Sequence, residues 1–158
     1  MKLDKIDIAI LKELQANARL SNVELSQRVR LSPSACSRRV EQLENDQVIE
    51  SYQAVLSNPA LGQTITAIIH ITLDRQAGRD LDLFETAVSD CPFIVACFLM
   101  SGEFDYLIRV NARDMAHFEQ IHKNWLSTLP AVSRIQSSFA MRTVINRANV
   151  ELSEFDKS

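Results

Sequence analysis

The pattern of apolar and polar positions changes near residue 60 of this 158-residue chain. Before that point, apolar residues recur every three or four positions, which is typical of helices buried on one face. After it, runs rich in Ile, Val and Thr alternate with helix-like segments, which is typical of strands between helices. The clearest break between the two patterns is Ser57-Asn58-Pro59-Ala60-Leu61-Gly62. We therefore expect a helical domain at 1–56, a hinge at 57–63, a second domain at 64–144 and a tail at 145–158.

The first domain is predicted to contain three helices. The first spans residues 4–16, where apolar positions follow helical spacing after an aspartate. The second starts after Ser21 and runs through Val29, because Ser21 and Glu24 have the spacing of a capping box. Residues 48–49 and 52–56 are β-prone, and they could pair as a small wing or form a strand leading away.

The third helix begins at Pro33, because Ser32 is a helix-capping residue and proline is tolerated at the first helical position. Cys36, Val40 and Leu43 recur at spacings of four and three, which predicts one buried stripe. The other faces of this helix carry Ser34, Ser37, Arg38, Arg39 and Gln42.

These polar residue types suit the major groove of DNA. Serine lets a backbone approach closely, arginine pairs with guanine or phosphate, and glutamine can pair with adenine. Residues 25–40 hold four arginines and no acid, whereas residues 41–50 hold four acids, so the basic window resembles a phosphate footprint. The alternative is an ordinary helical domain with a solvated polar face.

We predict a DNA-binding set on this half of the chain. Arg38 and Arg39 point about 100° apart on one helix, so only one is expected to reach base edges. Arg28 or Arg30 is expected at the DNA backbone. The full candidate set is Arg28, Arg30, Ser32, Ser34, Ser37, Arg38, Arg39 and Gln42.

The second domain is predicted to have the order β-α-β-β-α-β, an α+β ferredoxin-like arrangement with an antiparallel sheet and two helices on one face. The expected elements are a strand at 64–73, a helix at 80–91, a hairpin of strands at 93–100 and 106–110, a helix at 115–129 and a strand at 132–144. The strands are apolar on both faces, and a large exposed apolar face is normally an interface. We therefore expect a homodimer packed sheet to sheet.

The hairpin sequence Gly102-Glu103-Phe104-Asp105-Tyr106 is a candidate site for a free amino acid. Backbone amides near Gly102 can bind a carboxylate, and the side chain of Asp105 or Glu103 can pair with an ammonium group. From the residues alone, a plain hairpin turn with solvated acids remains the alternative. Apolar neighbours at Leu99, Met100 and Met115 favour leucine or methionine as the ligand.

The chain resembles the Lrp/AsnC, or feast/famine, transcription regulators of bacteria and archaea. The matching motifs, in order, are Leu3-Asp4-Lys5-Ile6-Asp7, Asn17-Ala18-Arg19-Leu20-Ser21, Leu31-Ser32-Pro33, Arg39-Val40-Glu41-Gln42-Leu43-Glu44, Tyr52-Gln53-Ala54 and Ser101-Gly102-Glu103-Phe104-Asp105-Tyr106. One departure is Gln47, where the family usually has glycine; a positive φ there would strain glutamine.

The resemblance implies a winged helix-turn-helix domain, homodimers that often assemble into octamers, and an amino-acid effector bound between dimers. It also implies a set of ligand-binding residues, to which the hairpin sequence itself adds Met100 and Glu103. The full candidate set is Leu99, Met100, Gly102, Glu103, Asp105, Tyr106, Met115, Ser137, Ser138, Phe139 and Ala140. Two-fold dimers would meet a pseudo-palindromic operator in double-stranded DNA. The operator sequence, the target genes and the sign of regulation are not encoded in any pattern we recognise.

Composition and charge narrow the remaining classes of protein and the expected location in the cell. The net charge is −3, but residues 1–63 hold eight basic and eight acidic side chains, so the acidic excess lies in the second half. The three cysteines lack metal-ligand spacing, and we expect no metal or other cofactor. Without an apolar run of 18 residues we expect no membrane partner, and a cytoplasmic, nucleoid-associated location. The competing hypotheses are an amino-acid-binding or metabolic enzyme of ferredoxin-like fold and a scaffolding protein, although no catalytic set is recognisable.

Overall fold

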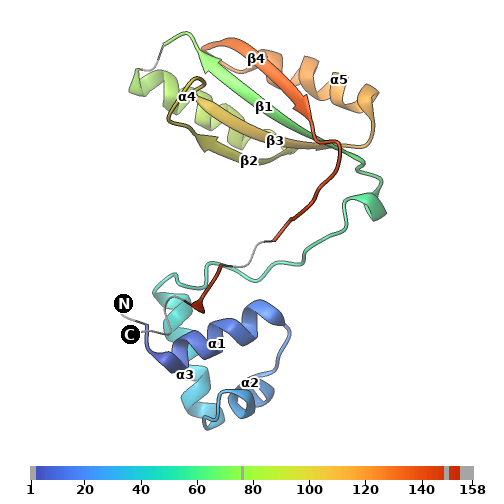
Figure 1. The fold of residues 1–158 in the computed structure, drawn as a ribbon. Coiled ribbons are helices and arrows are strands. Elements are labelled where there is room, and N and C mark those ends of the chain that lie inside the picture. The colour runs from blue at the N-terminus through green and yellow to red at the C-terminus, as the bar shows by residue number, and fades with distance from the viewer. Residues whose placement is uncertain (1–2, 76, 148–149, 154–158) are drawn as a thin grey trace. The chain divides into compact units, whose positions relative to one another are not determined.

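The computed structural model describes residues 3–75, 77–147 and 150–153 of the chain. It divides into two compact units, residues 1–55 with 145–158, and residues 56–144. We call the first unit the head and the second the sheet unit. Figure 1 shows the chain forming the three helices of the head, then the sheet, and then returning to the head with its last described residues. Each unit is described by itself below.

The head contains α1 (Lys5–Ala16), α2 (Asn22–Arg28) and α3 (Pro33–Asn45). All three predicted helix starts are confirmed. Asp4 and Asp7 form a capping box on α1, Ser21 and Glu24 form one on α2, and the Ser32 side chain accepts a hydrogen bond from the amide of Ala35. The core beneath these helices is built from Ile8, Ile10, Leu11, Leu25, Cys36, Leu43 and, from the end of the chain, Leu152.

Both α2 and α3 end in a Schellman motif, which places the residue after the helix cap in the left-handed region. At the end of α2 this residue is Arg30, with φ 56°, and the amide of Leu31 bonds to the carbonyl of Ser26. At the end of α3 it is Gln47, with φ 55°. The expected positive φ at Gln47 is therefore confirmed, and Arg30 shares the same strain.

The β-prone run after α3 does not form a strand in the described structure. Residues 50–56 are irregular, and Tyr52 is fixed instead by a 2.8 Å hydrogen bond from its hydroxyl to the carboxylate of Glu44. The prediction of a wing or an outgoing strand at residues 52–56 was therefore wrong. An extended segment is stabilised as a strand only by ladder hydrogen bonds to a partner strand. Burial and the Glu44 carboxylate raise the pKa of Tyr52 to about 12.

The sheet unit confirms the predicted β-α-β-β-α-β order. Its strands pair antiparallel in the order β2-β3-β1-β4. The elements are a 3-10 turn at Pro59–Leu61, β1 (Ile65–Leu73), α4 (Gly78–Ser89), β2 (Ile94–Leu99), β3 (Tyr106–Ala112), α5 (Met115–Asn124), a second 3-10 turn at Leu126–Thr128 and β4 (Val132–Phe139).

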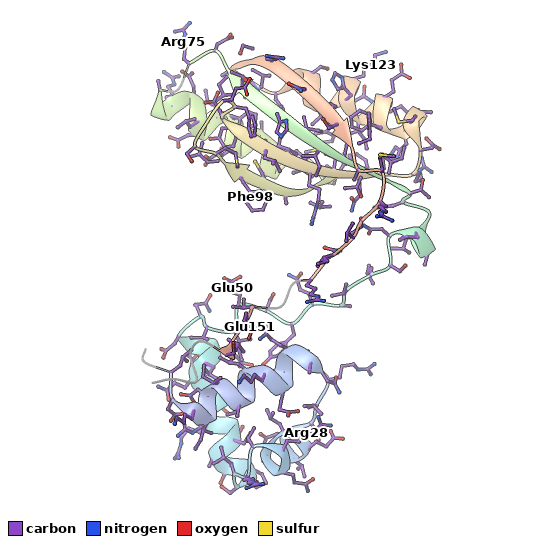
Figure 2. All side chains as sticks on the ribbon, viewed as in Figure 1. Arg28, Glu50, Arg75, Phe98, Lys123 and Glu151 are labelled. Atoms are coloured by element: carbon purple, nitrogen blue, oxygen red, sulfur yellow. The ribbon has the colours of Figure 1, made fainter. Side chains whose placement is uncertain are left out.

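The two helices cover one face of this sheet. Ala67, Ile69 and Ile71 of β1 are fully buried in a cluster with Phe84 of α4 and Phe118 of α5. The alternate residues of the strands lie on the opposite face, which no helix of the sheet unit covers (Figure 1). Phe98 projects from β2 on that side and is 55% exposed (Figure 2).

Two elements each end five residues earlier than predicted. The helix expected at 115–129 ends at Asn124, and a 3-10 turn follows it. The strand expected at 132–144 ends at Phe139, because the amide of Ala140 makes the last bond to β1, at the carbonyl of Thr66, and β1 itself begins at Ile65. Beyond that point the chain has no strand to pair with.

Candidate functional sites

Helix α3 presents one exposed stripe on the head. Cys36 and Leu43 are fully buried on one side of the helix, so the opposite side faces solvent. The exposed residues recur at spacings of three and four, as expected for one face of a helix. They are Ser34, Arg38, Glu41, Gln42 and Asn45. A serine, an arginine, a glutamine and an asparagine on one face can all hydrogen-bond base edges.

Arg39 does not belong to this stripe. Its Nη1 donates to Asp7 Oδ1 at 2.7 Å and to Asp4 Oδ2 at 2.8 Å, both on the α1 side of the head. Asp7 and Asp4 raise the pKa of Arg39. The backbone amide of Asp7, which donates to the Asp4 side chain, and the Arg39 guanidinium lower the pKa of Asp4. Arg39 therefore holds α3 against α1, which favours Arg38 over Arg39 as the one arginine expected to reach base edges.

The remaining candidate arginines also differ in whether they pair with an acid of the head. Arg28 forms a 2.8 Å ion pair with Glu13 on α1, whereas Arg30 and Arg38 are exposed and pair with no acid among the described residues. Arg30 sits at the turn between α2 and α3. Asn22 supports that turn, because its side-chain amide donates to the carbonyl of Pro33 at 2.8 Å.

All three predicted serines have local side-chain partners, and the hydroxyls of Ser32 and Ser34 lie 3.3 Å apart. Ser32 caps α3 through its side chain, and the hydroxyl of Ser37 donates to Glu41 at 3.2 Å. Ser32 therefore stabilises the start of α3, and its expected contact with DNA stays a prediction. Sequence reasoning missed Glu41 and Asn45, although their spacing of three and seven from Arg38 would have placed them on the same face.

The predicted ligand residues divide into two groups along the sheet. The hairpin group lies where β1 ends, because the amide of Asp105 bonds to the carbonyl of Ile71. Its exposed members are Leu99, Met100, Gly102 and Glu103. The second group extends from the middle of β1 to its start, since Ser137 pairs with Ile69, Phe139 pairs with Ala67 and Met115 follows the end of β3. Its members are Met115, Ser137, Ser138, Phe139 and Ala140.

Two hairpin residues have structural roles that leave little for a ligand. The Oδ2 of Asp105 accepts the amide of Leu73 at 2.7 Å, so this carboxylate holds the hairpin to the end of β1. Tyr106 is 1% exposed, and its hydroxyl donates to Glu85 of α4 at 2.7 Å. Burial and that carboxylate raise the pKa of Tyr106. Tyr106 lies under the helices, which corrects its expected contact with a ligand.

The described part of the sheet unit has two hollows. The one at the hairpin end has a volume of about 220 Å³ and is lined by His70, Thr72, Glu103, Phe104, Arg134 and Gln136. The other is a shallow hollow beside α5, where Met115, Phe118 and His122 form part of the lining. Phe139 of β4 contacts one lining residue, because its ring meets that of Phe118 edge to face at 5.0 Å.

Other kinds of site are not evident in the described parts of the chain. Among residues 3–75, 77–147 and 150–153, no group of three or more His, Cys, Asp or Glu side chains is arranged to hold a metal ion. The helices described there include none with the length and apolar character needed to cross a bilayer. Cys36 and Cys91 are buried, and burial raises the pKa of Cys36.

Comparison with protein families matches both units of the chain. Residues 3–50 match the model described as winged helix-turn-helix DNA-binding. Residues 66–150 match the model described as the Lrp/AsnC ligand binding domain. Together these matches include the exposed stripe of α3, both groups of candidate ligand residues and the return of the chain toward the head.

Similar proteins span nearly the whole chain. The leucine-responsive regulatory protein of Escherichia coli is 40% identical over 142 residues, 90% of this chain and 87% of its own. The Bkd operon transcriptional regulator of Pseudomonas aeruginosa is 36% identical over 147 residues, 93% of this chain and 96% of its own. A transcriptional regulator of Neisseria meningitidis, solved in complex with L-Met, has a TM-score of 0.89 and 38% identity, covering 96% of this chain and 98% of its own.

Proposed function

The chain belongs to the Lrp/AsnC family of transcriptional regulators, and from this membership we propose that paired heads bind operator DNA through α3 while the sheet unit senses a free amino acid. The exposed stripe of α3 is the observation that best supports the DNA-binding part of this proposal. Its polar residues lie on one face, Arg38 projects from the middle of that face, and Arg30 stands at the preceding turn.

The division of labour on the head follows from these contacts. Arg38, Ser34 and Gln42 read base edges in the major groove, with Asn45 further along the same face. Arg30 contacts the DNA backbone, where a cation adds affinity without sequence preference. Arg28 and Arg39 serve the head itself through Glu13 and the acids of α1.

The uncovered face of the sheet supports a homodimer. Ile68, Phe98 and Leu107 lie on that face, and Phe98 is more than half exposed in the single chain. Packing two such faces together removes this apolar surface from water. A two-fold dimer then presents two heads to a pseudo-palindromic operator with half-sites separated by whole helical turns.

The amino-acid site requires more than one copy of the chain. The hairpin group lies at the end of β1, whereas Phe139 pairs near its start, and the four residue steps from Ala67 to Ile71 alone span about 13 Å at the rise of a strand. One amino acid cannot extend from the hairpin group to Phe139 and Met115 within one chain. A hairpin from one subunit facing the Met115 group of another would complete the site, and this arrangement leads from dimers to a larger ring such as an octamer.

Leucine and methionine are the favoured effectors. Leu99 and Met115 are each more than half exposed, one in each group, so both groups offer an apolar surface to a ligand side chain. The amides around Gly102 and the carboxylate of Glu103 are available for the charged ends of the ligand. The related proteins named for leucine and solved with L-Met agree with this chemistry. We propose that the protein is not an enzyme and that it acts in the cytoplasm, in association with the nucleoid.

The decisive experiment measures binding of the full chain to duplexes selected from a random library, at several salt concentrations. We expect affinity to fall steeply as salt rises, because phosphate contacts release counterions. Arg38→Ala should weaken binding, while Arg79→Ala, a matched change on α4 of the sheet unit, should not.

Calorimetry with leucine, methionine and asparagine, followed by light scattering, tests the sensing half. Leucine or methionine should bind and alter the assembly state or the duplex affinity. Turnover of an amino acid without any duplex binding would instead support the enzyme hypothesis.

A further inference from the structure

The last described residues of the chain are part of the head. Leu152 is only 8% exposed and belongs to the same buried cluster as Ile8, Ile10 and Leu11 of α1. An apolar side chain in such a cluster contributes to stability like any other core residue. The core of the head is therefore closed by a residue more than a hundred positions away in sequence.

A reciprocal pair of hydrogen bonds holds the same segment to α1. The amide of Val150 donates to Oε1 of Gln15 at 2.7 Å, and Nε2 of Gln15 donates to the carbonyl of Val150 at 3.2 Å. Next to this pair, Glu151 is exposed, and its carboxylate accepts the amide of Ser153 at 2.9 Å (Figure 2). One glutamine thus recognises the backbone of Val150 in both directions, as a neighbouring strand would.

This docking gives the head a second covalent connection to the sheet unit. The first connection runs forward from Tyr52, which is fixed to Glu44, to the start of β1 at Ile65. The second runs from Ala140, the last residue bonded to β1, to Val150, ten positions later. Ten residues span at most about 36 Å, so a docked segment sets an upper limit on the separation of its two ends.

We propose that residues 150–153 form a strap that completes the head of their own chain and restricts the positions which the head can take when it binds DNA. The first part of this proposal stands on the contacts alone, and the second rests on the proposed DNA binding. The docking surface is the side of α1 that carries Gln15, and its occupant is the C-terminal segment of the same chain.

Amide hydrogen exchange of the full-length protein tests the docking. Leu152→Ala should accelerate exchange of the α1 amides at least about thirtyfold, the lower end of the range for truncating a buried leucine, and leave the sheet unchanged. Gln15→Ala removes the paired bonds without opening a cavity, so it reports on the strap even if Leu152→Ala unfolds the head. Val150→Ala is the matched control, because that side chain is 64% exposed and only its backbone is used. Equal α1 exchange in Leu152→Ala and Val150→Ala would overturn the proposal.

A cross-linking experiment tests which chain supplies the strap. Cysteines at Gln15→Cys and Val150→Cys, joined by a short dithiol cross-linker, should give a product of one chain on a denaturing gel, with each single variant as background. A two-chain product would overturn docking within the same chain.

Duplexes with half-sites at graded spacings test the restriction on the head. The wild-type protein should prefer half-sites on one face of the helix, and Leu152→Ala should bind in-phase and out-of-phase spacings almost equally. Unchanged spacing selectivity in a variant whose α1 exchange has accelerated would overturn the second part. Absence of duplex binding by the wild type would count against the proposed function, and the exchange rates would still decide the docking.

Discussion

Arg39 and Asp7 are joined by a 2.7 Å hydrogen bond between α3 and α1. Asp7 is 7% exposed, and its other carboxylate oxygen accepts the amide of Asp4 in the capping box that starts α1. The same acid therefore starts one helix and anchors another. Arg38, the neighbour of Arg39 in sequence, is exposed, so the two arginines of α3 have separate roles: one fixes the helix, and the other is available to DNA.

The first prediction concerns this arginine pair. Arg39→Ala should lower the free energy of unfolding of the head by about 1–3 kcal/mol, because it leaves the buried carboxylate of Asp7 without its cation. Arg38→Ala should change stability by less than about 0.5 kcal/mol and weaken duplex binding instead. Urea unfolding and duplex titration of both variants measure the two effects. Equal losses of stability in the two variants would contradict the assignment.

The second prediction concerns pH. The capping bond from the amide of Asp7 and the ion pair with Arg39 lower the pKa of Asp4 in the folded head from its ordinary 3.8. The ionised form is thus favoured by folding, so its contribution is present above pH 3.8 and is lost as pH falls through the lower, folded pKa. Asp4→Asn keeps a good helix cap but removes the charge. Unfolding of α1 followed by NMR should show a shallower acid loss in Asp4→Asn, with the two proteins converging once the pH lies below the folded pKa of Asp4. A parallel decline of both proteins would refute this role of Asp4.

Local signals in the sequence predicted the helices of the head well. Ser21 with Glu24 and Ser32 with Pro33 mark helix starts through bonds to residues within the next turn, so no distant part of the chain was needed. The β-branched, partly alternating pattern at residues 64–73 likewise predicted strand β1, although not which of its two faces the helices bury. The exposed stripe of α3 was predicted in part, because its spacing is also a local property.

Features that depend on distant partners could not be predicted. The end of β4 is set by where β1 begins, more than sixty residues earlier, and not by the apolar run that continues past Phe139. The role of Arg39 depends on acids 32 and 35 positions away. Tyr106 matched a family motif, but its hydroxyl turns to Glu85 beneath the helices, a contact that the motif does not encode.

The third prediction concerns Gln47, which follows the cap of α3 with φ 55°. A side chain in this region is strained by roughly 1 kcal/mol, and glycine removes the strain while adding some freedom to the unfolded chain. Gln47→Gly should therefore raise the free energy of unfolding of the head by roughly 0.5–1 kcal/mol. Urea titration checks the sign, and Gln53→Gly, in the irregular segment, is the control that should give no gain. A loss of stability in Gln47→Gly would show that its side-chain bond to the carbonyl of Glu44 outweighs the strain.

The fourth prediction uses the second strained position to separate stability from binding. Arg30 occupies the same place at the end of α2 that Gln47 occupies at the end of α3, with φ 56°. Arg30→Gly should therefore stabilise the head by the same roughly 0.5–1 kcal/mol. It should also weaken duplex binding and reduce the salt slope by about one, because one phosphate contact is lost. Gln47→Gly is the matched control, with the same relief of strain and no change of charge. If both glycine variants bind duplex equally well, Arg30 does not contact DNA; if only Arg30→Gly loses affinity while gaining stability, the strained arginine is retained for binding at a cost to the fold.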